Sequence, residues 1–106
     1  MFEETKVEGA VTFLHAGALE AAESRGNRIK CEHMLKHIKA LEMNKSQESS
    51  VSAQERDAYA SDKYKDAIVE LEKAVIADEV LRAKREAALA YIDAWRTEQA
   101  NTRFTV

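Results

Sequence analysis

Residues 61–103 read SDKYKDAIVELEKAVIADEVLRAKREAALAYIDAWRTEQANTR and contain neither glycine nor proline. Proline is absent from all 106 residues of the chain. Because proline costs about 3 kcal/mol inside a helix and glycine about 1 kcal/mol, this stretch favours one long helix, over about residues 61–102. Such a helix would measure about 60 Å and cannot bury its own apolar side. The sequence therefore predicts an all-α fold in which other helices lie against it.

Spacings of four and three residues alternate along this predicted helix and mark one side of it. The side consists of Ala67, Leu71, Ala74, Asp78, Leu81, Arg85, Ala88, Ile92 and Trp95. A repeat sustained over about four heptads is typical of a coiled-coil seam. A flank of apolar residues lies outside the seam, at Ile68, Val75, Val80, Leu89 and Tyr91. We expect this flank to be exposed in the monomer and covered by self-association.

The preceding residues predict the rest of a single helical domain that spans 1–106. A first helix is expected over about residues 2–44, with apolar side chains at helical spacing in two stripes. The stripes are Val7, Val11, Leu14, Ala18 and Ala21, and then Cys31, Met34, Leu35, Ile38 and Leu41. Gly26 and Asn27 weaken the helix between them, and a continuous but strained helix is favoured over two separate ones.

Residues 45–52 read KSQESSVS and predict the connecting loop, because serine side chains compete for backbone hydrogen bonds. Ser52 and Glu55 match a capping box, which predicts a short helix over about residues 53–60. Since the loop is short, the two long helices should return antiparallel. The predicted product is a long, coiled-coil-like helical hairpin that oligomerises into a bundle.

Composition limits the classes of protein that fit. The chain has 19 acidic and 16 basic residues, a formal net charge of −3, which argues against coating DNA through bulk charge. The single cysteine cannot form an internal disulfide and favours a reducing, cytoplasmic setting. No segment approaches the roughly 20 apolar residues of a membrane span, and the acidic start lacks the basic region of a signal peptide.

Side chains capable of chemistry are few. His33 and His37 are four residues apart on one helix face, near Cys31, but no third metal ligand is evident beside them. The sequence has no glycine-rich phosphate loop and no serine nucleophile elbow, and a slender hairpin offers no concave pocket. We therefore expect no enzyme activity, no metal and no cofactor.

Basic residues gather in the second half of the first helix. Residues 24–45 contain Arg25, Arg28, Lys30, Lys36, Lys39 and Lys45 against two acids, Glu32 and Glu42, a local balance of 6 − 2 = +4. A basic face of this kind can meet DNA or RNA phosphates, an acidic face of a partner protein, or only solvent. The stretch has no aromatic residue on which bases could stack.

Polar residues interrupt the seam of the long helix at its middle. Asp78 and Arg82 are four residues apart and can pair on one helix, and Asp78 and Arg85 occupy seam positions. An ion pair that sets register and partner choice is favoured over a ligand site, and leucine at Arg85 is expected to raise stability. Trp95 is expected to anchor the helix end, and a recognition hot spot of Trp95 and Arg96 is the alternative.

Several segments of the second half resemble a group of small, uncharacterised helical proteins of tailed bacteriophages and prophages. The segments are SAQERDAYAS at 52–61, YK at 64–65, LRAKREAA at 81–88 and IDAWRT at 92–97. Genes of this group often lie among recombination and replication functions. The resemblance implies a phage origin and a location in the host cytoplasm, and it implies no catalytic residue.

These observations favour a non-enzymatic accessory protein that binds a phage or host protein and forms a homo-oligomer. Its expected work is to modulate phage recombination or replication, or a host nuclease. Direct DNA or RNA binding through the basic face of residues 25–45 is one alternative. Inhibition of a host defence complex is another, with acidic candidates at Glu70, Glu72, Asp78, Glu79 and Glu86.

Overall fold

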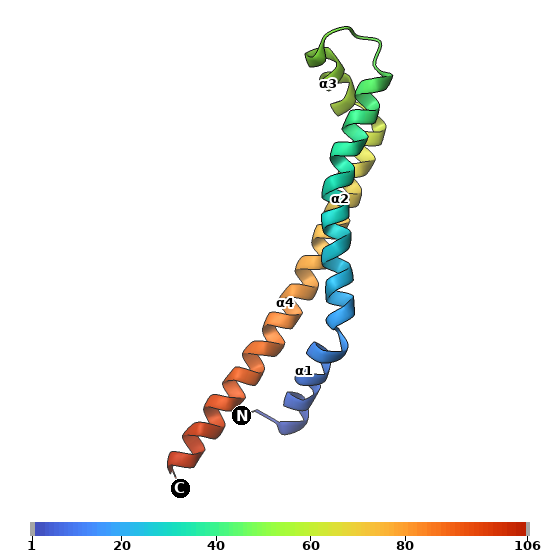
Figure 1. Cartoon of the computed structure of the whole chain (residues 1–106). Coiled ribbons are helices and arrows are strands. Elements are labelled where there is room, and N and C mark those ends of the chain that lie inside the picture. Colours follow the sequence, from blue (N-terminus) through green and yellow to red (C-terminus); the bar gives the residue numbers. More distant parts are fainter. Residues whose placement is uncertain (1, 106) are drawn as a thin grey trace. The chain divides into compact units, whose positions relative to one another are not determined.

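The computed structural model describes residues 2–105 and forms four helices (Figure 1). They are α1 (Glu4–Ala16), α2 (Ala18–Lys45), α3 (Val51–Tyr59) and α4 (Asp62–Thr105). No strand occurs among these residues, so the predicted all-α class is confirmed. The residues cluster into two compact units. The first combines the N-terminal residues up to Ala22 with those from Glu79 onward, and the second is Glu23–Asp78.

The second unit is a helical hairpin, as the sequence predicted. Its part of α2 and its part of α4 run antiparallel, and α3 lies beside them at the loop end (Figure 1). Buried or half-buried positions alternate by three and four on both helices, the pattern of a coiled-coil seam. They are Ser24, Arg28, Cys31, Leu35, Ile38 and Glu42 on α2, and Ala67, Leu71, Ala74 and Asp78 on α4.

The loop and α3 differ from their predicted bounds. The loop covers residues 46–50, and α3 begins at Val51. Its N-cap is Ser50, whose Oγ accepts a hydrogen bond from the N–H of Ala53 at 3.2 Å. The predicted capping box at Ser52 is therefore wrong, because Ser50 has the extended backbone of an N-cap, φ −91° and ψ 146°, whereas Ser52 lies inside the first turn.

The junction between α3 and α4 is held by Ser61. Its Oγ donates to the carbonyl of Ala58 at 2.7 Å and accepts from the N–H of Tyr64 at 3.2 Å. The serine therefore closes one helix and caps the next. Ala58 is fully buried, and its small side chain lets α3 approach the hairpin closely.

The first unit places α1 against the C-terminal part of α4. The inward positions of its N-terminal residues are Val7, Ala10, Leu14, Gly17 and Ala21. The predicted stripe was thus partly wrong, since Val11 and Ala18 are exposed and Ala10 and Gly17 replace them. Both choices fit helical spacing, and the structure places the smaller residues inward. On α4, the predicted seam residues from Leu81 to Trp95 are all buried or half-buried.

The predicted helix over residues 2–44 is two helices, and the break lies at Gly17 rather than near Gly26. Gly17 has φ −87° and ψ 4°, outside the helical region. A Cβ atom there would stand 2.7 Å from the carbonyl oxygen of Phe13, and a Cβ at Gly26 would meet no atom within 4 Å beyond the backbone of its own helix. The helix is continuous through Gly26. The break is therefore marked by the backbone of Gly17 itself, where a Cβ would crowd the carbonyl oxygen of Phe13.

Candidate interaction site

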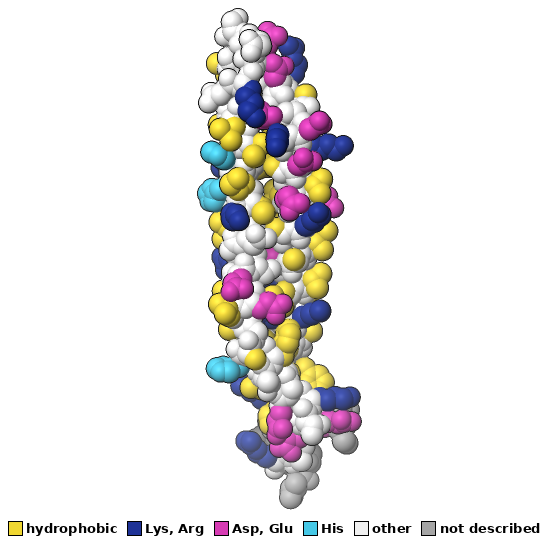
Figure 2. Space-filling model, turned by 90° about the vertical axis from the view of Figure 1, so that its right-hand side faces the viewer, with side chains coloured by type: hydrophobic (Ala, Val, Ile, Leu, Met, Phe, Trp, Pro, Cys, Tyr) yellow, Lys and Arg dark blue, Asp and Glu magenta, His cyan; other side chains and the backbone are white. Residues whose placement is uncertain are grey.

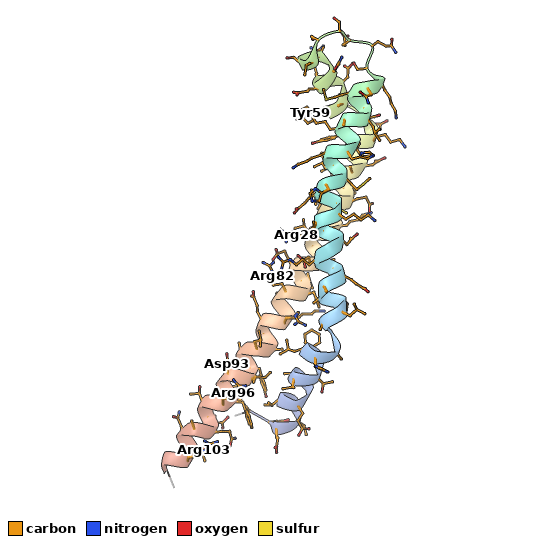
Figure 3. All side chains as sticks on the ribbon, viewed as in Figure 1. Arg28, Tyr59, Arg82, Asp93, Arg96 and Arg103 are labelled. Atoms are coloured by element: carbon orange, nitrogen blue, oxygen red, sulfur yellow. The ribbon has the colours of Figure 1, made fainter. Side chains whose placement is uncertain are left out.

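Arg28 and Asp78 form the polar centre of the seam in the second unit, and Figure 3 labels Arg28 on α2. Nη1 of Arg28 donates to Oδ2 of Asp78 at 3.2 Å across 50 residues of sequence. The side chain of Asp78 is 9% exposed, and Nε of Arg28 also lies 3.5 Å from Glu32. The ion pair foreseen at Asp78 exists, but its cation comes from α2. Because both residues occupy seam positions, the pair fixes the level at which α2 and α4 meet.

Arg82 and Arg85 have different roles from those expected at the seam. Arg82 is exposed, and its Nη1 lies 3.9 Å from Glu79. In the first unit, Nη1 of Arg85 donates to the backbone carbonyl of Leu14 at 3.2 Å. Leu14 belongs to the last turn of α1, where carbonyl groups have no following helical N–H to accept from. Arg85 therefore compensates the break at Gly17.

The end of α4 in the first unit holds the N-terminal residues. Tyr91 accepts at its hydroxyl from the N–H of Glu3 at 3.3 Å, and its ring meets Phe2 edge-on at a centroid distance of 5.0 Å. Tyr91 is half-buried, so its predicted place in the exposed flank was wrong. Trp95 is half-buried on the seam. Arg96 is exposed beside Asp93 at 3.8 Å.

The six bases of residues 24–45 do not form one face. Arg28 pairs with Asp78, Lys39 lies 3.8 Å from Glu55, and Lys45 lies 2.9 Å from Glu42. The other three, Arg25, Lys30 and Lys36, are exposed. Six residues separate Lys30 from Lys36, which turns them about 120° apart around the helix. Arg25 and Lys36 are eleven residues apart and share one side of α2, so the basic face expected from the sequence loses Lys30 and is partly neutralised by the ion pairs.

Lys39 and Tyr59 form a cluster that sequence spacing did not indicate. Nζ of Lys39 stands 4.8 Å from the centre of the Tyr59 ring, and that ring meets Tyr64 edge-on at 5.2 Å. Hydrogen bonding to the Tyr59 side chain, with Glu55 nearby, raises the pKa of Lys39 above its ordinary value. The cluster attaches α3 to the hairpin. Only the fold brings residues 20 positions apart together, and no local pattern could have revealed it.

A groove of about 410 Å³ lies between α2 and α4 in the second unit. Its lining comprises Asn27, Lys30, Cys31, Met34 and Ile38 from α2, and Lys63, Asp66, Ala67 and Glu70 from α4. A smaller hollow of about 190 Å³ shares Ile38 and Lys63 and adds Leu41. The expectation of no concave pocket is therefore wrong. The alanine at position 67 leaves space beside Met34, which the sequence pattern alone could not show.

Hydrophobic side chains alternate with charged ones over the side of the molecule shown in Figure 2. Of the predicted flank, Ile68, Val80 and Leu89 are 46%, 48% and 52% exposed, whereas Val75 is half-buried. Over residues 2–105, no three His, Cys, Asp or Glu side chains are grouped to hold a metal ion. Within the same residues, no helix combines the length and hydropathy of a membrane span.

Comparison with protein-family models, with curated proteins and with solved structures finds no significant match to this chain. The fold and the site define an all-α protein whose second unit is a helical hairpin, with an ion pair at the centre of its seam and a groove between α2 and α4.

Proposed function

We propose that this chain is a non-enzymatic interaction protein that binds a phage or host protein and acts as a homo-oligomer. The observation that carries the proposal is the imbalance between buried and exposed apolar side chains. In the described part of the chain, the buried hydrophobic residues are Val7, Ala58, Ala74 and Ile92, and thirteen large hydrophobic side chains are at least 37% exposed. Apolar exposure of this extent on a small protein marks surfaces that other proteins cover.

The surface best suited to a different protein lies on the outer side of α4. Val69 and Ile76 are 41% and 54% exposed and seven residues apart, so they share one side of the helix. The seam residue Leu71 is two residues after Val69, and the seam residue Ala74 is two residues before Ile76. A step of two residues turns about 200° around the helix axis. The pair therefore points away from α2. Glu72 and Lys73 lie between them, which favours a partner that presents apolar side chains together with charged groups of both signs.

The resemblance to tailed-phage proteins supports a particular setting for this partner. It favours a protein of phage recombination or replication, such as a strand-annealing protein, or a host nuclease, in the host cytoplasm. A host defence complex is the alternative protein partner.

Partner capture during phage infection tests the proposal. We expect wild-type protein to co-purify with one partner, and the Val69→Lys/Ile76→Lys variant to lose it. Val51→Lys is the matched control, because Val51 is 64% exposed on α3, and it should retain the partner. Equal capture by all three proteins would remove the outer side of α4 from the proposal.

Direct nucleic-acid binding is tested separately by fluorescence anisotropy with labelled single- and double-stranded DNA at two salt concentrations. Arg25→Glu/Lys36→Glu is the informative variant, since both side chains are exposed and share one side of α2. Salt-sensitive binding that this variant loses would favour nucleic acid as the ligand. Turnover of nucleic acid or nucleotide by the pure protein with added metal ions would overturn the non-enzymatic assignment.

A further inference from the structure

We propose that residues 2–16, which comprise α1 and the two residues before it, form a detachable cover on α4 in the first unit. The cover opens at Gly17 while the second unit stays folded, and opening exposes Ile92 and Trp95 of α4. The inference does not depend on the partner surface at Val69 and Ile76, because those residues belong to the second unit.

Contacts along α4 show where the cover lies. Nη1 of Arg85 donates to the carbonyl of Leu14 at 3.2 Å. The hydroxyl of Tyr91 accepts from the N–H of Glu3 at 3.3 Å, so Ile92, the next residue, is level with the start of the cover. Ile92 is 9% exposed, and the first unit consists of the N-terminal residues and the C-terminal part of α4. The cover is therefore what buries Ile92.

Trp95 lies on the same side of α4. Phe2 contacts α4 on either side of this tryptophan, since its ring meets Tyr91 edge-on at 5.0 Å and its N–H donates to Oε2 of Glu98 at 3.2 Å. Trp95 falls between these two residues along the helix, within about 60° of each around the axis, and is half-buried. Tryptophan is among the residues most enriched at binding hot spots. Opening of the cover therefore controls access to the only tryptophan of the chain.

The apolar contact between the ends of the cover is thin. The inward residues of α1 are Val7, Ala10 and Leu14, and of these only Val7 is buried. Val11 and Phe13 are 50% and 37% exposed, so they add little apolar area to the contact. The hydrogen bonds at the two ends of the cover therefore carry much of its attachment to α4.

The helix α1 is weak by itself. It has 13 residues, and isolated helices shorter than about 12–15 residues are marginal in water. Gly9 lies inside it, and its N-cap, Glu3, makes no side-chain hydrogen bond to the helix. In contrast, Ser50 caps α3 and Ser61 caps α4. Because α1 depends on its contacts with α4, it belongs to the part of the protein that opens at the lowest free energy.

Gly17 provides a hinge of one residue between α1 and α2. The N–H of Gly17 donates to the carbonyl of Phe13 at 3.0 Å, and the N–H of Ala21 donates to the carbonyl of Gly17 at 3.0 Å. Helical hydrogen bonds therefore continue up to both sides of the hinge. The ψ angle of Gly17 is 4° instead of the helical value of about −42°, and glycine restricts backbone rotation less than any other residue. The cover can thus move as one piece.

The second unit has contacts that keep it closed when the cover opens. Arg28 and Asp78 pair at 3.2 Å at the centre of its seam, and Lys39 attaches α3 through the ring of Tyr59 at 4.8 Å. All four residues belong to the second unit, so their contacts persist in the open state. Opening of the cover is therefore a local event and leaves the hairpin folded.

Hydrogen exchange without denaturant, measured by mass spectrometry of peptide fragments, tests the proposal. In the wild type, fragments from residues 7–16 should be protected at least about tenfold less than fragments from residues 28–42, because they exchange through the local opening. Arg85→Leu should raise the exchange rate of residues 7–16 at least about fivefold, because the carbonyl of Leu14 loses its donor, and leave residues 28–42 unchanged. Arg82→Leu is the matched control, since Arg82 is an exposed residue of the same unit, and it should change neither fragment.

Tyr91→Phe tests the other end of the cover, and it replaces Arg85→Leu should that variant lose the helical circular dichroism of the wild type. Phenylalanine keeps the ring against Phe2 but removes the acceptor of the Glu3 N–H. Exchange in the α1 fragments should therefore rise about twofold, and acrylamide should quench the fluorescence of Trp95 more strongly than in the wild type.

Equal protection of the α1 and α2 fragments in the wild type would overturn the proposal. Variants that change both fragments alike, or neither of them, would overturn it as well. Partner capture through Val69 and Ile76 is a separate measurement, so failure of the proposed function and failure of the cover are distinguishable.

Discussion

Arg85 donates from Nη1 to the backbone carbonyl of Leu14 at 3.2 Å, and the same guanidinium nitrogen lies 4.0 Å from the place of a Cβ on Gly17. A cation at a seam position thus donates a hydrogen bond to a backbone carbonyl at a helix break. Sequence reasoning assigned this arginine to an ion pair and expected a stabilising effect of leucine. The structure reverses that expectation, because leucine cannot donate to the freed carbonyl.

Arg85→Leu should lower the free energy of unfolding by about 1–3 kcal/mol, the cost of a half-buried acceptor left without a donor. Urea denaturation followed by circular dichroism measures it. Arg82→Leu is the control, since Arg82 is exposed beside Glu79, and it should change stability by less than about 0.5 kcal/mol. A stabilised Arg85→Leu variant would contradict the helix-break role.

Gly17→Ala and Gly26→Ala should have opposite effects on stability. The first places a Cβ 2.7 Å from the carbonyl oxygen of Phe13 and should cost about 1–3 kcal/mol, as overpacking does. The second adds a methyl group in open space inside α2 and should stabilise by about 0.5–1 kcal/mol. Thermal melts of the two variants and the wild type measure both effects. Melting temperatures that shift in the same direction for both variants would contradict the structure.

Arg28→Met should destabilise the protein more than Asp78→Asn. The first leaves a carboxylate with 9% exposure without its partner on α2, at a cost of about 3 kcal/mol. The second keeps an acceptor at the site and leaves Arg28 beside Glu32 at 3.5 Å, so about 1 kcal/mol is expected. A double-mutant cycle measures their coupling, and a coupling energy near zero would show that the two side chains act independently.

Lys39 should contribute stability that disappears at high pH. Its pKa is raised in the folded protein, first by the hydrogen bond to Tyr59. The contribution is therefore complete below the ordinary lysine pKa of about 10.4 and is lost as pH rises through the higher folded value. Melting temperatures of the wild type, Lys39→Met and the exposed control Lys36→Met, measured from pH 9 to 12, test this.

The wild type and Lys36→Met should lose stability in parallel above about pH 10.4, and Lys39→Met should lose less. Parallel curves for all three would remove Lys39 as a contributor.

Helix formation in α4 and the composition of its seam were determined by the sequence itself. The sequence of α4 lacks glycine and proline over residues 61–103, and its apolar residues Ala67, Leu71 and Ala74 alternate by four and three. Both are local properties, and helix formation depends on local preference and periodicity. Tertiary structure decided what depends on contacts between distant residues. Gly17 and Gly26 have equal intrinsic flexibility, yet the helix breaks at Gly17 and continues through Gly26. Arg28 found Asp78 across 50 residues of sequence, and the groove arose where Met34 lies beside Ala67. Such contacts depend on the level at which two helices meet, and a single helix carries no information about that level.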